Sequence, residues 1–126
     1  MDNSQKKILV VEDDKDLADI LVDGLSVSNF RVLRAEDGEE ALALIIDQKP
    51  HVVLLDLLLP KLDGFKVLER VRHYPDRDIA QTRVVVLSNL SSNKDILSIQ
   101  ALKVDEYFVK SNTNLQDVYK KIREIT

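Results

Sequence analysis

The sequence predicts an α/β fold in which helices cover both faces of a parallel sheet. Five short apolar runs alternate with segments of helical period, an order typical of repeated strand–helix units. The runs are continuously apolar, as in 52–55, rather than alternating, which indicates strands buried on both faces. A length of 126 residues with 44% hydrophobic content suits one globular domain with its own core. We therefore expect one domain over 1–126, built on a doubly wound five-stranded parallel sheet.

Each expected strand is a short run, rich in β-branched residues and leucine, that stops at polar residues. The runs lie at 8–11, 32–33, 52–55, 84–87 and 107–109. The second run is the weakest, because only Val32 and Leu33 carry it.

The expected helices are the segments whose apolar residues recur at helical spacing. They cover 17–25, 38–49, 65–71, 96–101 and 115–125, and the period is weakest in 96–101. Asp37 opens the second helix and Pro50 ends it, since proline cannot continue a helix. Asn114 is a suitable N-cap for the last helix. The one long irregular segment, 74–82, contains Pro75 and several charges, so we expect a surface loop there.

Composition excludes several classes of function. The chain has no cysteine, which excludes a disulfide framework, a thiolate zinc site, a cysteine nucleophile and an iron–sulfur cluster. Its 18 basic and 22 acidic residues give a net charge of −4 without a basic block, so binding to nucleic acid or to an anionic membrane has no electrostatic support. No apolar run approaches the about 20 residues of a membrane span, and no signal peptide is expected at the N-terminus. We expect a cytoplasmic protein.

Chemically capable residues follow four of the expected strands. Glu12, Asp13 and Asp14 follow the first strand, Asp56 follows the third, Ser88 ends the fourth and Lys110 follows the fifth. In open α/β sheets, ligands bind at the carboxyl ends of the strands. Each residue alone also has a structural explanation: Asp13 or Asp14 as a helix N-cap, Ser88 as a loop serine, Lys110 as a solvated lysine. Their common position favours one site.

The residues of this predicted site point to phosphoryl chemistry that depends on a metal ion. Several carboxylates in one crevice repel one another, and a hard divalent cation removes that repulsion. Mg²⁺ prefers oxygen ligands and keeps several waters, so it fits such a group. Asp56 beside the cation is then a carboxylate nucleophile. Mg²⁺, the Lys110 ammonium and the Ser88 hydroxyl can each take one oxygen of a transferred phosphoryl group.

Four segments, in this order, resemble a response-regulator receiver domain of two-component signalling over nearly the whole chain. They are ILVVEDD at 8–14, LLDLLLPKLDG at 54–64, VVLS at 85–88 and DEYFVK at 105–110. The resemblance implies a flavodoxin-like (βα)5 fold with strand order 2-1-3-4-5, and a stand-alone, chemotaxis-type receiver.

The resemblance also implies a role for each site residue. Asp56 would accept a phosphoryl group from the phosphohistidine of a histidine kinase or a histidine phosphotransfer protein. Asp13 would bind Mg²⁺ directly and Glu12 mainly through water, and Asp56 and the Leu58 backbone carbonyl would be further ligands. Lys110 would pair with a phosphate oxygen.

A switch follows from the same resemblance. Ser88 would turn inward to the new phosphate, and Tyr107 would move from an exposed to a buried rotamer. This local change would bias the surface formed by the helix at 96–101, the strand at 107–109 and the helix at 115–125. An unidentified downstream protein would read that surface. Whether a homodimer forms on phosphorylation is left open.

The sequence departs from the family pattern at a few positions. Ser111 follows Lys110 where receivers usually have proline with a cis peptide bond, which costs about 3 kcal/mol before other residues. Asn89 stands where a small residue is usual, and we expect it to narrow access for the phosphodonor. Lys103 and Val104 replace a common glycine–alanine pair. The resemblance also implies that the residues at two positions, Leu58 and Leu90, influence how water reaches the phosphate. Because both are apolar, we expect slow dephosphorylation.

The sequence favours a phosphoacceptor that does not act as an enzyme on a separate substrate, and three other functions have less support. A receiver-like adaptor that works without phosphorylation is supported only by Ser111 and Asn89. A flavin- or nucleotide-binding domain would need a glycine- or hydroxyl-rich loop after the first strand, and acidic residues stand there instead. An aspartate phosphatase would need a second aspartate at position 58, which is leucine. The last helix ends at Thr126, so a stand-alone protein and a piece of a longer one are both left open.

Overall fold

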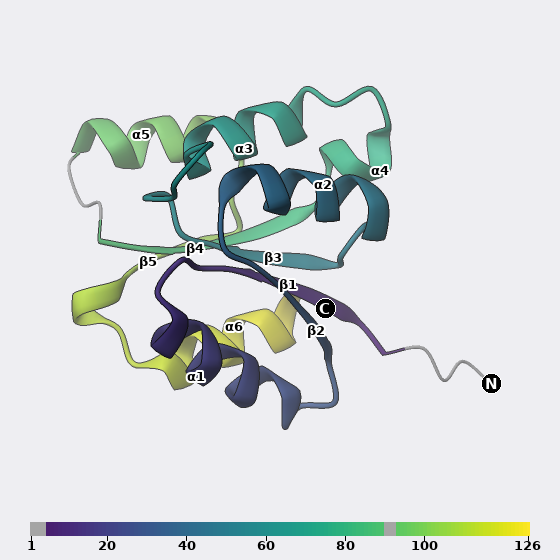
Figure 1. Cartoon of the computed structure of the whole chain (residues 1–126). Coiled ribbons are helices and arrows are strands. Elements are labelled where there is room, and N and C mark those ends of the chain that lie inside the picture. Colours follow the sequence, from purple (N-terminus) through teal and green to yellow (C-terminus); the bar gives the residue numbers. More distant parts are fainter. Residues whose placement is uncertain (1–4, 90–92) are drawn as a thin grey trace.

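The computed structural model describes residues 5–89 and 93–126 and shows a five-stranded parallel sheet between two layers of helices (Figure 1). The strand order is β2-β1-β3-β4-β5, which confirms the predicted fold and order. The strands are β1 (Lys7–Val11), β2 (Arg31–Ala35), β3 (Val52–Leu55), β4 (Arg83–Ser88) and β5 (Glu106–Val109).

The helices lie on both faces of the sheet, as the buried strands predict. One layer contains α1 (Lys15–Ser26) and α6 (Leu115–Ile125) (Figure 1). The other layer contains α2 (Gly38–Gln48), α3 (Gly64–Arg72), the short α4 (Arg77–Ala80) and α5 (Asn93–Ala101). A single 3-10 turn, η1 (Lys110–Asn112), links β5 to the last helix. Among the described residues, no helix is long and apolar enough to cross a membrane.

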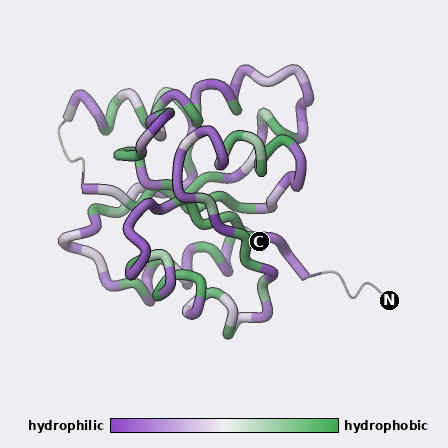
Figure 2. Tube along the Cα trace, in the orientation of Figure 1, coloured by the Kyte–Doolittle hydropathy of each residue, from purple (hydrophilic) through white to green (hydrophobic). Residues whose placement is uncertain are grey.

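Two apolar cores lie on the two sides of the sheet. Successive residues of a strand point to opposite faces, so Ile8 and Val10 pack under α1 and α6, and Leu9 and Val11 pack under the opposite helices. Figure 2 shows hydrophobic residues along the central strands, and hydrophobic alternating with hydrophilic residues along the helices. The rigid sheet between these cores fixes where the ends of its strands lie.

The segment 74–82 is not only the surface loop that the sequence predicted. It contains α4, which Asp76 caps by accepting a hydrogen bond from the Asp78 N–H at 2.9 Å. Ile79 is buried in the core beneath this single turn. A four-residue helix is too short to show a period, which explains why the pattern missed it.

Arg72 of α3 fastens the connection between α5 and β5. Its guanidinium donates to the carbonyls of Ala80 and Thr82 at 2.9 and 2.7 Å, and to those of Leu102 and Lys103 at 2.7 and 3.1 Å. Burial lowers the Arg72 pKa from its ordinary value, although Asp105 opposes the shift. Lys103, which replaces the family's usual glycine, has a left-handed φ of 59°. Such a backbone favours glycine, and the bond from Arg72 holds it here.

Gly38 allows the start of α2 to lie directly on the loop after β3. Its N–H donates to the Pro60 carbonyl at 3.3 Å, and a Cβ at this position would overlap the Leu62 carbonyl oxygen. We expect Gly38→Ala to lower the free energy of unfolding by about 2 kcal/mol, because the backbones must separate. Urea denaturation measures the loss. Ala43→Gln adds a larger side chain on the exposed face of the same helix and should cost less than about 0.5 kcal/mol; equal losses would contradict the packing explanation.

Candidate functional site

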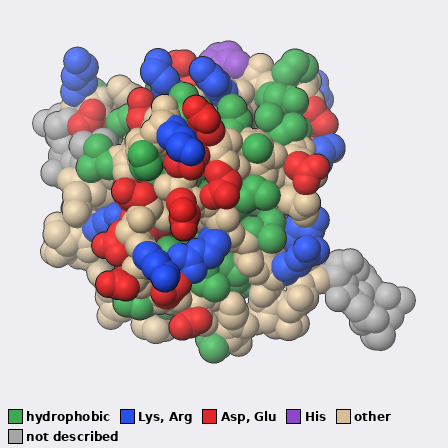
Figure 3. All heavy atoms as spheres, in the orientation of Figure 1, with side chains coloured by type: hydrophobic (Ala, Val, Ile, Leu, Met, Phe, Trp, Pro, Cys, Tyr) green, Lys and Arg blue, Asp and Glu red, His purple; other side chains and the backbone are tan. Residues whose placement is uncertain are grey.

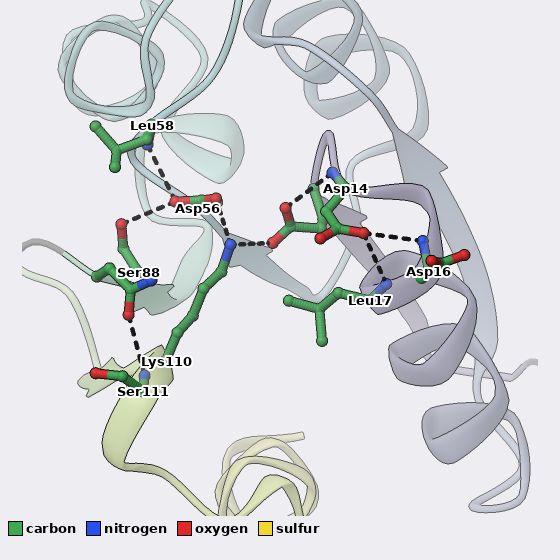
Figure 4. Close-up of polar contacts among 10 residues, drawn as sticks. Asp14, Asp16, Leu17, Asp56, Leu58, Ser88, Lys110 and Ser111 are labelled. Atoms are coloured by element: carbon green, nitrogen blue, oxygen red, sulfur yellow. Dashed lines mark hydrogen bonds and ion pairs between the residues drawn. The ribbon is translucent and has the colours of Figure 1, made fainter.

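The predicted site residues meet at the carboxyl edge of the sheet (Figure 4). Glu12 follows β1, Asp56 follows β3, Ser88 ends β4 and Lys110 follows β5. The first three residues are nearly inaccessible to solvent, with exposed fractions of 3%, 4% and 0% for Glu12, Asp56 and Ser88. Sequence reasoning therefore identified the members of one buried polar cluster.

The sheet itself holds the two buried carboxylates in place. The Glu12 N–H donates to the Ala35 carbonyl, and the Asp56 N–H donates to the Val11 carbonyl, each at 3.1 Å. These bonds extend the strand pairing by one residue, so both side chains leave the backbone at a fixed point. The two acids are therefore brought together by the pairing of their strands rather than by any local motif.

Asp14 and Asp13 have different positions. Asp14 caps α1, since its Oδ1 accepts hydrogen bonds from the N–H groups of Asp16 and Leu17 at 3.0 and 3.2 Å (Figure 4). This confirms the structural explanation for Asp14. Asp13 is exposed and contributes one carboxylate oxygen to a group with Glu12 and Asp56, whose three oxygens lie within 4.8 Å of one another.

Lys110 lies between the two buried acids. Its Nζ is 2.7 Å from Glu12 Oε1 and 2.7 Å from Asp56 Oδ2, and the side chain is 19% exposed. Figure 4 shows the ammonium bridging carboxylates from two different strands. Removing a cation from such a position leaves like charges facing each other in a poorly solvated site.

Burial and ion pairing act in opposite directions on the charges of this cluster. Burial by itself lowers the pKa of Lys110, but its bonds and ion pairs with Asp56 and Glu12 outweigh burial and raise that pKa above its ordinary value. Lys110 therefore stays charged at neutral pH. Burial raises the pKa of Glu12 above its ordinary 4.5, and the Asp56 charge adds to the shift, although bonds from Lys110 and the Asp14 N–H reduce it.

Both oxygens of Asp56 are engaged. Oδ1 accepts from the Ser88 hydroxyl at 2.8 Å and from the Leu58 N–H at 3.0 Å, while Oδ2 faces Lys110. Three donors therefore orient the carboxylate: a hydroxyl at the end of β4, a backbone N–H after β3 and an ammonium after β5. The sequence did not reveal the Leu58 N–H as a donor, because a backbone contact of this kind has no side-chain signal. The assignment of the Leu58 carbonyl as a metal ligand stays a prediction.

Ser88 and Tyr107 are already in the inward arrangement that the resemblance assigns to the phosphorylated form. The Ser88 hydroxyl bonds Asp56, and the Tyr107 hydroxyl is buried without a hydrogen-bond partner among the described residues. Burial raises the pKa of Tyr107, and the charges of Asp95 and Asp56 add to this effect. The expected exposed starting position of Tyr107 is therefore not the one seen here.

The acidic group fits a hard cation by its chemistry. Three carboxylates supply only oxygen donors, which is the ligand type that Mg²⁺ prefers. Two of the three carboxylates are the ones that also hold Lys110. A bound cation and the Lys110 ammonium would therefore share two carboxylates, those of Glu12 and Asp56.

The departures from the family pattern lie at this edge as well. The Lys110–Ser111 peptide bond is trans, and the Ser111 N–H donates to Asn89 Oδ1 at 3.0 Å. Sequence reasoning named both residues but missed their contact, although each follows the end of an adjacent strand. Leu58 is 55% exposed, and Leu90 lies outside the described residues, so slow dephosphorylation stays a prediction.

Known proteins resemble this chain along most of its length. A sequence model of the response regulator receiver domain matches residues 8–123. The chain is 37% identical over 106 residues to the probable transcriptional regulator ycf27 of Porphyridium aerugineum, covering 84% of this chain and 42% of that protein. It is 36% identical over 119 residues to the transcriptional regulatory protein CpxR of Klebsiella pneumoniae, covering 94% of this chain and 48% of that protein. The chain thus spans less than half the length of these relatives.

Solved structures share its fold. The receiver domain of the Francisella response regulator 1452 superposes with a TM-score of 0.85 at 26% identity, covering 96% of each chain. The Vibrio cholerae chemotaxis protein CheY4 superposes with a TM-score of 0.86 at 23% identity, covering 98% of this chain and 100% of that chain, which shows the fold alone. The match to the family along nearly all of the sequence shows more than the fold: this chain belongs to the response regulator receiver domains of two-component signalling.

Proposed function

We propose that Asp56 accepts a phosphoryl group from the phosphohistidine of a histidine kinase or a histidine phosphotransfer protein. The observation that carries the proposal is the engagement of this buried carboxylate by Lys110 Nζ at 2.7 Å and by the Ser88 hydroxyl at 2.8 Å. A nucleophile held in this way needs little reorganisation before it attacks. The same two donors lie where the oxygens of a new aspartyl phosphate would need partners.

The proposed chemical step transfers the phosphoryl group from the histidine nitrogen to an Asp56 oxygen. One Asp56 oxygen attacks phosphorus, the bond from phosphorus to the histidine nitrogen breaks, and the nitrogen keeps the electron pair. Lys110 and Ser88 transfer their contacts from Asp56 to the phosphoryl oxygens, which keeps the negative charge paired. Mg²⁺ held by Glu12, Asp13 and Asp56 would supply the remaining neutralisation of charge.

Phosphorylation would be read through the surface of α5, β5 and α6. Ser88 bonds Asp56, and Tyr107 lies on the strand paired with that of Ser88. We propose a downstream protein as the reader, in the cytoplasm, and no separate substrate. The chain carries 18 basic and 22 acidic residues, and on the face in Figure 3 the two kinds are interspersed. We therefore propose no nucleic-acid contact for this domain itself. The stand-alone, chemotaxis-type organisation stays a prediction, since the curated relatives are longer.

One observation favours a second function, an adaptor that works without phosphorylation. Ser88 already bonds Asp56 and the Tyr107 hydroxyl is already buried, so the signalling surface would be formed in the unmodified protein. The two functions differ in whether Asp56 is modified at all.

Intact-protein mass spectrometry distinguishes them. Incubation with Mg²⁺ and acetyl phosphate should add one phosphoryl mass to the wild-type chain. Asp56→Asn should stay unmodified, because an amide is not a nucleophile for phosphorus, and EDTA should abolish labelling of the wild type. An unmodified wild-type chain, in the presence of a labelled control receiver, would refute the phosphoacceptor and leave the adaptor.

Mg²⁺ affinity should depend on pH through Glu12. Its folded pKa lies above the ordinary 4.5 because of burial, so protons compete with the metal at a higher pH than at an exposed glutamate. Titration calorimetry should show the affinity decreasing as pH falls from neutrality through that raised pKa. Glu12→Gln should bind more weakly at pH 7 but with a flatter pH dependence. An unchanged pH dependence in this variant would rule out Glu12 as the titrating group.

Lys110→Met should destabilise the protein most when Mg²⁺ is absent. Loss of the ammonium leaves Glu12 and Asp56 unpaired, and we expect the free energy of unfolding to fall by about 3 kcal/mol. Saturating Mg²⁺ should restore part of the loss, because it binds the folded state. Lys49→Met breaks an exposed pair with Asp76 and should have little effect. Urea denaturation with and without Mg²⁺ measures the free energy of unfolding of both variants. Equal losses in Lys110→Met and Lys49→Met would argue against a special role for Lys110.

A further inference from the structure

Asn89 and Ser111 join the ends of two neighbouring strands just outside the buried cluster. Ser88 and Val109 are the last paired residues of β4 and β5. Asn89 is the next residue along one strand, and the Ser111 N–H donates to its Oδ1 at 3.0 Å. Figure 4 draws this contact beside Ser88 and Lys110. The bond therefore continues the link between the strands beyond the end of the sheet.

The bond also satisfies a group that the local backbone leaves without a partner. The first N–H groups of a helical turn have no acceptor within the turn, and Val109, at the N-cap of η1, makes no side-chain capping bond. Asn89 supplies an acceptor from another strand instead. The Thr113 hydroxyl donates to the Val109 carbonyl at 2.6 Å and closes the far side of the same turn.

Lys110 lies at the start of this turn, and its ammonium must reach Glu12 and Asp56. A turn tied at Ser111 and closed by Thr113 limits the positions that the Lys110 backbone can take. The tie at Ser111 requires a backbone N–H, which is the group that proline lacks. Thus the serine that replaces the usual proline is the residue that makes the bond possible.

We propose that Asn89 is a positioning residue, whose side chain clamps the turn after β5 and so keeps the Lys110 ammonium on the phosphoacceptor Asp56. This inference rests on the function proposed above. The clamp gives Asn89 and Ser111 one shared role, because Asn89 provides the accepting oxygen and Ser111 provides the donating N–H. The clamp also ties Lys110 to Ser88, because Asn89 follows Ser88 directly in the chain.

Four variants separate the clamp from other effects at these positions. Asn89→Ala removes the acceptor, whereas Asn89→Asp keeps a carboxylate oxygen in its place. Ser111→Pro removes the donor, whereas Ser111→Ala changes the same residue but keeps its N–H and is the matched control. Each variant is examined as the whole chain, and circular dichroism establishes that it is folded.

The first readout is the rate of labelling by acetyl phosphate with Mg²⁺. Loss of one hydrogen bond that positions a charged group predicts about a 3- to 10-fold slower rate for Asn89→Ala and for Ser111→Pro. Ser111→Ala should label at the wild-type rate. The double variant Asn89→Ala/Ser111→Pro should be labelled no more slowly than either single variant, because both substitutions remove the same hydrogen bond. Additive losses, or a wild-type rate in Asn89→Ala, would overturn the proposal.

The second readout does not require phosphorylation. NMR should show faster hydrogen exchange of the Ser111 amide in Asn89→Ala, with protection restored in Asn89→Asp. The ¹⁵N signal of the Lys110 ammonium should broaden in Asn89→Ala but not in Ser111→Ala, as its ion pairs loosen. Unchanged exchange and ammonium signals would exclude the clamp. If the wild-type chain takes up no phosphoryl group while these signals change as expected, the proposed function fails and the clamp stands.

Discussion

The site depends on one cation placed between two buried carboxylates. Glu12 and Asp56 are brought to adjacent points by the pairing of β1 with β3, and both are almost fully enclosed. Like charges so placed repel strongly where water is scarce. Lys110 Nζ lies 2.7 Å from an oxygen of each, and its raised pKa keeps it charged. One side chain, at the start of the turn η1 that follows the edge strand β5, therefore neutralises both buried acids.

Two of the residues that pair with Lys110 also belong to the acidic group that fits a metal ion. The oxygens that pair with the ammonium belong to the same residues as the acidic group of Glu12, Asp13 and Asp56. Glu12, Asp13 and Asp56 would hold a divalent cation there, and the cation would supply positive charge beside the acids that pair with Lys110. Ser88 already lies on Asp56, and the Tyr107 hydroxyl is buried without a partner among the described residues. A buried hydroxyl without a partner is costly.

The segments before and after β5 are each held by a side chain from another part of the chain. Arg72 holds the connection before β5, where Lys103 takes a left-handed backbone that glycine usually provides. Asn89 contacts the turn after β5, where Ser111 stands in place of proline. In both cases a hydrogen bond replaces a constraint that the family usually places in the backbone itself. β5, which carries Tyr107 and leads to Lys110, is thus fastened at both ends by residues distant in sequence.

The sequence by itself determined the alternation of strands and helices, the caps at Asp37 and Asn114, and the strand ends that carry Glu12, Asp56, Ser88 and Lys110. These features depend on local period and on residue type, which a chain displays directly. Only the tertiary structure decided which oxygens Lys110 pairs with, that Asp14 caps a helix while Asp13 joins the acidic group, and that Asn89 meets Ser111. It also decided that 74–82 contains a helical turn over buried Ile79. The main physical reason is distance: Lys110 with Glu12 and Asn89 with Ser111 are contacts between residues far apart in the sequence, and no local pattern encodes which side chains a folded sheet brings within hydrogen-bonding reach.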